Sequence, residues 1–131
     1  MIIAIVGTSK LTDDELDKVC CHIETIVRRL GDNDKIITGD AEGVDHAVRL
    51  WTPRSKLIVE KAETKQWNAV DGFKARNIRI AQKADKVISI STKIKLERCY
   101  HCDIPNHERT GGCWTMKQGK KLNKETELII V

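Results

Sequence analysis

The residues with the clearest chemical potential form a cysteine–histidine segment in the last third of the chain. Cys99, Cys102, His107 and Cys113 follow the spacing C-x2-C-x4-H-x5-C. Two cysteines separated by two residues can direct both thiolates into one tetrahedral site, and a histidine and a third cysteine complete the set with no open position. The pattern therefore predicts a structural zinc, Zn(2+), site.

Two alternatives stay open for this segment. His101 competes with His107 as a ligand; we prefer His107, because His101 lies between the two close cysteines and would have to point the other way. The cysteines could also be reduced, buried thiols, but the segment has few apolar residues to bury them, and a metal would supply ordering energy. The odd count of five cysteines argues against a disulfide framework, and the adjacent Cys20 and Cys21 are expected to pack.

Glycine-containing turns form a second group of candidate residues. Gly7, Thr8 and Ser9 follow the apolar run 2–6, and the stretch T-G-D-A-E-G-V-D at 38–45 precedes a helical pattern. Such turns let the backbone approach a phosphate, and the free N–H groups of a helix start favour an anion. Neither turn completes a dinucleotide or P-loop motif, so a tight turn with a helix cap is the ordinary interpretation of the first.

The hydrophobic pattern places these turns in an α/β fold. Short strands are expected at 2–6, 35–37, 57–59, 87–90 and 128–131, and helices at about 12–30, 44–51, 72–83 and 114–119. Aliphatic runs that alternate with amphipathic helices are typical of βαβ units. They predict a three-layer α/β/α sandwich with a mostly parallel five-stranded sheet. Ligands in such sheets bind beyond the carboxyl ends of the strands.

Length and composition limit the classes of protein. We expect residues 1–131 to form a single domain, with the Cys/His loop at 93–113 as an insertion, because this length suits one domain. A net charge of +4 and only 4% aromatic residues permit a nucleic-acid partner but do not favour one. No apolar run could span a membrane, and no basic region precedes the first one, so we expect a cytoplasmic protein without a membrane partner.

Taken in order, the motifs resemble the SLOG superfamily. The closest similarity is to its YspA/YpsA-like branch, which is related to DprA and to the Lonely Guy phosphoribohydrolases. The resemblance spans nearly the whole chain except about 93–110. It is carried by G-T-S at 7–9, the stretch 38–45, G-F-K-A-R-N at 72–77, A-D at 84–85 and G-G-C-W-T at 111–115. It implies a Rossmann-like fold with a nucleotide or nucleotide-derived ligand at the carboxyl ends of the strands.

The resemblance also implies a set of ligand-binding residues. Arg76 matches the family's arginine and is expected to pair with a phosphate, while Ser9 and Thr115 offer hydroxyl groups and the glycines backbone contacts. The expected pocket comprises Gly7, Thr8, Ser9, Gly39, Gly43, Asp45, Arg76, Asn77, Gly111, Gly112 and Thr115. A zinc-bound loop would hold the turn at 111–112 beside this pocket.

Several of these residues also have ordinary interpretations. Asp45 could accept N–H groups as an acid in the first turn of a helix. Arg76 could belong to a solvated basic helix face with Lys74 and Arg79. Trp67 could stack on a base as a lid, or it could cover the edge of a small core.

Catalysis is less well supported by the resemblance. Lonely Guy enzymes carry a P-G-G-x-G-T-x-x-E turn whose glutamate takes part in cleaving the base from the ribose. Gln118 occupies that position here and cannot act as a general base, and Trp114 replaces a glycine. We therefore expect a ligand-binding or sensing module with no assigned catalytic residue.

The alternative functions are a phosphoribohydrolase-like enzyme with an altered site and a DprA-like binder of single-stranded nucleic acid. Members of this superfamily often pair, which allows a homo-oligomer.

Overall fold

Strands and helices alternate along the chain in the computed structural model, which describes all residues from 1 to 131. The elements are β1 (Ile2–Gly7), α1 (Asp13–Arg28), β2 (Lys35–Thr38), α2 (Val44–Trp51), a 3-10 turn (Arg54–Lys56), β3 (Leu57–Val59), α3 (Phe73–Lys83), β4 (Lys86–Ser91), α4 (Gly111–Lys121) and β5 (Glu125–Ile130). The strands form one sheet in the order β3-β2-β1-β4-β5, and every neighbouring pair is parallel. The predicted Rossmann-like α/β fold is confirmed, with a sheet that is entirely parallel.

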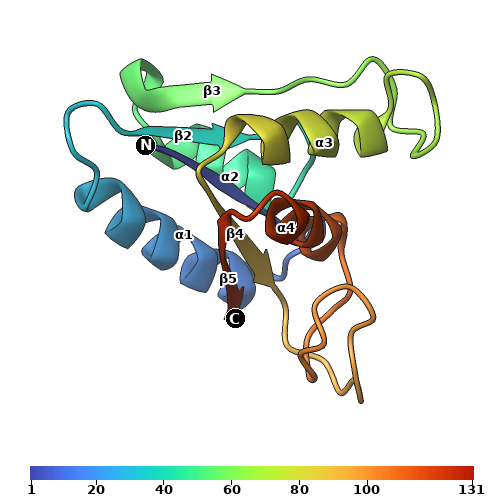
Figure 1. The fold of residues 1–131 in the computed structure, drawn as a ribbon. Coiled ribbons are helices and arrows are strands. Elements are labelled where there is room, and N and C mark those ends of the chain that lie inside the picture. Colours follow the sequence, from blue (N-terminus) through green and yellow to red (C-terminus); the bar gives the residue numbers. More distant parts are fainter.

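Helices cover both faces of the sheet (Figure 1). Helices α1 and α2 pack on one face, and α3 and α4 pack on the other. Along β1 the side chains alternate between the two cores: Ala4 and Val6 join the α3/α4 core, and Ile5 joins the α1/α2 core. Because both faces are buried, the strand is a continuous aliphatic run rather than an alternating one.

Helix α1 begins at the predicted capping box. The Thr12 hydroxyl accepts from the Glu15 backbone N–H at 3.2 Å, and the Glu15 carboxylate accepts from the Thr12 N–H at 2.9 Å. The two bonds satisfy donors that a helix start otherwise leaves free. α1 spans 16 residues, and neither it nor any other helix of the structure has the length and apolar character needed to cross a membrane.

Two elements differ from their predicted bounds. Helix α4 begins at Gly111 rather than 114, because the Thr110 side chain accepts from the backbone N–H groups of Gly112 and Cys113 and caps the helix there. The glycine pair predicted as a turn is therefore the first helical turn, and the segment between β4 and α4 runs from 92 to 110. Strand β5 begins at Glu125, where exposed glutamates alternate with half-buried residues, as suits an edge strand.

Candidate functional site

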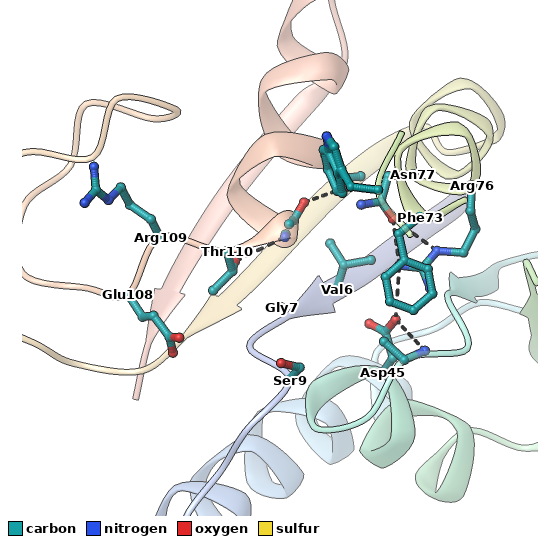
Figure 2. Close-up of a pocket in the computed structure, with 15 residues that line it drawn as sticks. Val6, Gly7, Ser9, Asp45, Phe73, Arg76, Asn77, Glu108, Arg109 and Thr110 are labelled. Carbon is teal, nitrogen blue, oxygen red and sulfur yellow. Dashed lines mark hydrogen bonds and ion pairs between the residues drawn. The ribbon is translucent and has the colours of Figure 1, made fainter. Parts of the chain in front are cut away.

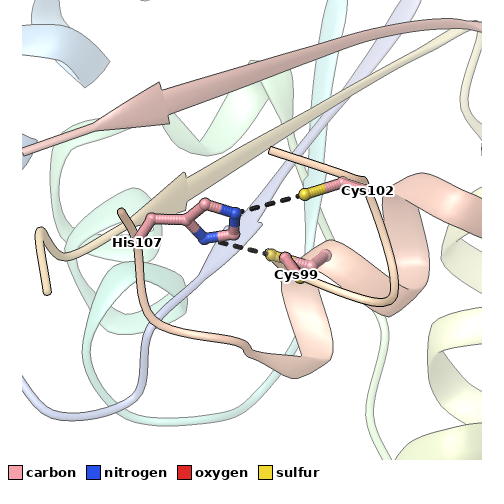
Figure 3. A group of neighbouring side chains, drawn as sticks. Cys99, Cys102 and His107 are labelled. Atoms are coloured by element: carbon pink, nitrogen blue, oxygen red, sulfur yellow. Dashed lines mark hydrogen bonds between the residues drawn. The ribbon is translucent and has the colours of Figure 1, made fainter. Parts of the chain in front are cut away.

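Four buried side chains form a cluster beside the first turn of α4. The ligand atoms of Cys99, Cys102, His107 and Cys113 all lie within 4.8 Å of one another. Two ligands held tetrahedrally at the zinc–sulfur distance of about 2.3 Å are separated by about 3.8 Å, so a small adjustment would close the set around one ion. Figure 3 shows the Cys102 thiol directed at the His107 ring, with Cys99 beside them. These four residues could hold a metal ion.

The backbone of the loop forms a compact turn that brings the cysteines together. The Cys99 carbonyl accepts from the Asp103 N–H at 2.7 Å, and the Cys99 N–H donates to the Ile104 carbonyl at 3.2 Å. Asp103 and Asn106 have φ values of 67° and 63°. Asp and Asn adopt this left-handed conformation more readily than other residues with a side chain. The local sequence therefore suits a turn that returns the chain to His107.

His107 is oriented as a neutral imidazole ligand would be. Its Nδ1 lies 2.8 Å from the carbonyl oxygen of Glu108. Because a carbonyl only accepts, Nδ1 donates this hydrogen bond, and Nε2 faces the Cys102 sulfur at 3.2 Å. A carbonyl that holds the second ring nitrogen is the common support of a metal-bound histidine. The Cys113 sulfur, in turn, lies 3.6 Å from the Ser91 hydroxyl, which can donate to it.

The Cys102 thiol is held in its neutral form by its surroundings. Burial, followed by the neighbouring Cys99 and Cys113, raises the pKa of Cys102 to about 11. A bound metal ion stabilises the thiolate form directly and reverses this balance. The structure brings His107, and not His101, to the three cysteines. The His101 Nδ1 is buried without a hydrogen-bond partner.

A cavity of about 320 Å³ lies next to the cluster, beyond the carboxyl end of β1. The strand order reverses between β1 and β4, which is where parallel α/β sheets bind ligands. Figure 2 shows Glu108 and Arg109 on one side of this cavity and Phe73, Arg76 and Asn77 on the opposite side. We call it the polar cavity, because its lining carries two acids, two arginines, an asparagine and several hydroxyl groups. The lining residues are Val6, Gly7, Ser9, Ala41, Asp45, Trp67, Phe73, Arg76, Asn77, Glu108, Arg109, Thr110, Gly111, Gly112 and Thr115.

The polar cavity gathers most of the residues expected to bind the ligand. Those that line it are Gly7, Ser9, Asp45, Arg76, Asn77, Gly111, Gly112 and Thr115. Thr8, Gly39 and Gly43 do not. Thr8 is buried, and its hydroxyl accepts from the Thr92 N–H at 3.2 Å, so it ties the first turn to the end of β4.

The two remaining glycines support the walls of the polar cavity. A Cβ at Gly39 would lie 2.5 Å from the Asp45 carboxylate. Gly43 has a φ of 70°, and a Cβ there would lie 2.2 Å from the Thr8 carbonyl. Both positions therefore require glycine to let the turn after β2 pack against its neighbours.

Arg76 is a buried, paired cation rather than part of a solvated face. It is 4% exposed, and its Nη1 lies 2.8 Å from the Asp40 carboxylate. Its Nη2 lies 3.9 Å from the Asp45 carboxylate and donates to the Asn77 side-chain oxygen at 2.8 Å, while the guanidinium sits 4.0 Å from the centre of the Phe73 ring. An incoming phosphate would meet an arginine that already holds two carboxylates, and its pairing with Arg76 stays a prediction.

Asp45 is the most perturbed acid of the polar cavity. It is 3% exposed, and burial raises its pKa to about 6, although the Arg76 charge opposes the shift. Its carboxylate accepts weakly, at 3.4 Å, from the Ala41 N–H in the turn before α2. Asp45 therefore supports that turn and brings a carboxyl group that titrates near neutral pH into the polar cavity.

Sequence reasoning missed several lining residues, of which Arg109 is the most notable. It is exposed and makes no ion pair, and its guanidinium lies 4.7 Å from the centre of the Tyr100 ring. Phe73, Glu108 and Thr110 were missed as well. The signal that could have found Glu108, Arg109 and Thr110 is their place between His107 and Cys113, beside the expected pocket turn.

The cluster and the polar cavity share one stretch of chain. His107 and Cys113 belong to the cluster, and all five residues between them, 108–112, line the polar cavity. The wall packs tightly, because a Cβ at Gly112 would lie 2.8 Å from the Gly7 Cα at the end of β1. Gln118 does not line the polar cavity.

Comparisons with known proteins identify no relative of this chain. No family model, no curated protein and no solved structure matches the chain.

Proposed function

We propose that this chain binds a nucleotide or a nucleotide-derived phosphorylated metabolite in the polar cavity, and that a structural zinc ion on the Cys/His cluster holds one wall of that cavity. The observation that carries the proposal is the shared stretch of chain: two cluster residues, His107 and Cys113, enclose the wall 108–112. The protein would act as a binding or sensing module.

The donor set favours zinc. Three thiols and one imidazole, all buried, match the ligands of closed structural zinc sites. Thiolates are soft ligands that disfavour magnesium and calcium, which prefer oxygen donors. With four protein ligands the ion would have no open position for a substrate, so its role would be to order the loop.

The chemistry of the polar cavity suits a ligand with both an anionic group and hydroxyl groups. Arg109 and the N-terminus of α4 offer positive charge for a phosphate. Asp45 and Glu108 offer carboxylate oxygens, each with spare lone pairs, to the hydroxyl groups of a ribose. The resemblance to the SLOG superfamily points to the same class of ligand.

Metal content and binding in the same preparations test the proposal. Native mass spectrometry should find one zinc ion per chain in the wild type and in Cys21→Ser, which removes an exposed cysteine outside the cluster. It should find none in Cys102→Ser. Binding of the four 5′-mononucleotides AMP, GMP, CMP and UMP is then measured by calorimetry. Loss of zinc should weaken binding of the tightest of them, because the wall 108–112 would lose its support.

Two results would contradict the proposal. A metal-free chain that binds the same mononucleotide as tightly as the zinc-loaded chain would show that the cluster does not support the cavity wall. Absence of binding for both the mononucleotides and ribose 5-phosphate in the zinc-loaded wild type would remove the ligand class.

A further inference from the structure

The aromatic residues of this chain have an unusual distribution. The sequence holds only five of them, and four, Trp67, Phe73, Tyr100 and Trp114, line the polar cavity or the cavity next to it. None of the five is buried in a core, which is built from aliphatic side chains, cysteines and a methionine. Aromatic side chains usually contribute much of a protein's buried core area. Here they gather instead around an open site.

The second cavity has a volume of about 380 Å³, and we call it the aromatic cavity. It is lined by Trp67, Tyr100, His101, Arg109, Thr110, Gly111 and Trp114. Four of these residues also line the polar cavity, so the two cavities adjoin across Thr110 and Gly111. Each volume lies in the range of about 300–1,000 Å³ that is common for small-molecule sites.

The walls of the aromatic cavity are flat rings and one planar cation. The Trp67 and Trp114 ring centres lie 5.0 Å apart with an angle of 81° between the planes. The Arg109 guanidinium lies over the Tyr100 ring. Tyr100 is 66% exposed and Trp67 is 37% exposed, so their surfaces are open to a ligand. Stacking on such surfaces is how proteins hold an unpaired base, and an arginine plane adds to it.

We infer that the aromatic cavity is a nucleobase subsite, so that a mononucleotide lies with its base there and its ribose and phosphate in the polar cavity. This inference rests on the proposed function. It adds that the heteroaromatic base of the ligand contributes much of the binding affinity. Both cavities adjoin the Cys/His loop: residues 108–112 line the polar cavity, and Tyr100, which follows Cys99, lines the aromatic cavity. A single mononucleotide suits this arrangement better than a nucleic-acid strand, because the two adjoining cavities are compact.

The test compares the four 5′-mononucleotides with ribose 5-phosphate, which lacks the base. On zinc-loaded wild-type protein the tightest mononucleotide should bind at least about tenfold more tightly than ribose 5-phosphate. It should also quench tryptophan fluorescence, whereas ribose 5-phosphate should not. Tyr100→Ala and Trp67→Leu should each weaken the mononucleotide by about tenfold and change ribose 5-phosphate by less than about twofold.

Controls separate a subsite from damage to the fold. Trp51→Ala removes an exposed aromatic side chain on α2, away from both cavities, and should change neither affinity. The zinc content of each variant is measured alongside, because Tyr100 adjoins a cluster cysteine. If Tyr100→Ala loses zinc, Tyr100→Leu takes its place in the comparison.

The outcomes distinguish this inference from the proposed function. If ribose 5-phosphate binds as tightly as every mononucleotide, or if the aromatic variants weaken both ligands equally, the nucleobase subsite is wrong while the proposed function stands. If neither ligand binds the wild type, the proposed function fails and the inference fails with it. If a single-stranded oligonucleotide binds more tightly than any mononucleotide, with a steep dependence on salt, the ligand is a nucleic acid and the inference is overturned.

Discussion

The parallel sheet and the Cys/His loop are stabilised by different means. In the sheet, aliphatic residues on both faces of β1, such as Ala4 and Ile5, are fully buried against helices. In the loop 92–110 there is no helix or strand, and three of its four buried side chains, Cys99, Cys102 and His107, belong to the cluster. We therefore expect the scaffold and the cavity wall to be perturbed separately, because the scaffold is buried by aliphatic side chains whereas the wall lies between two residues, His107 and Cys113, that could bind a metal ion.

The largest effect on stability is expected in the sheet. Ile5→Ala leaves a void in a fully buried position and should lower the free energy of unfolding by about 2–5 kcal/mol. Leu50→Ala, at a position 68% exposed, should change it by less than about 0.5 kcal/mol. Urea denaturation measures both. Equal effects of the two variants would contradict the assignment of stability to the sheet core.

A pH-dependent effect is expected at the border of the two regions, where Asp45 lies. Its pKa is raised to about 6 in the folded chain from an ordinary 3.8, so the folded state binds this proton more tightly than the unfolded state. Its contribution to stability therefore falls as pH rises from about 4 to about 6, by about 3 kcal/mol in total. Asp45→Asn should remove that step.

The measurement compares the unfolding free energies of wild type and variant at each pH. The difference between them should shift in favour of Asp45→Asn by about 3 kcal/mol between pH 4 and pH 7. The exposed Asp32→Asn serves as the control and should show no such shift. A constant difference for Asp45→Asn would show that burial does not perturb this carboxyl.

A smaller effect, but a more specific one, is expected from the helix caps. Thr12 caps α1 in the scaffold, and Thr110 caps α4 in the cavity wall. Replacing either by alanine should cost about 1 kcal/mol in thermal or urea unfolding. Only Thr110→Ala should also weaken mononucleotide binding, because the first turn of α4 lines the polar cavity. Weaker binding by Thr12→Ala to the same extent would contradict the separation of the two regions.

The fold was predictable where burial leaves a pattern in the sequence. Strand β1 is covered on both faces and therefore appears in the sequence as a run of aliphatic residues. The capping box at Thr12 marks the start of α1. The start of α4 was not predictable from propensity, because Gly111 and Gly112 are poor helix formers and the Thr110 side chain sets the boundary.

The candidate site was predictable where spacing alone constrains it. The C-x2-C-x4-H-x5-C pattern named the four residues that the structure brings together. The lining of the cavities depends on long-range packing instead. Arg109 and Trp67 lie in segments without regular structure, where no periodicity indicates which way a side chain points. Gly39 was expected to contact the ligand, yet it makes room for Asp45 and Arg76.

Hydrogen–deuterium exchange of zinc-loaded and chelator-treated protein shows whether a metal ion on the cluster orders the cavity wall. Because the cluster would hold the wall 108–112 while burial holds the sheet, removal of zinc should increase exchange across about 96–113 and leave β1 and β4 protected. Cys21→Ser should give the wild-type pattern in both states. Identical exchange of the loop with and without zinc would contradict the claim that the metal cluster supports the cavity wall.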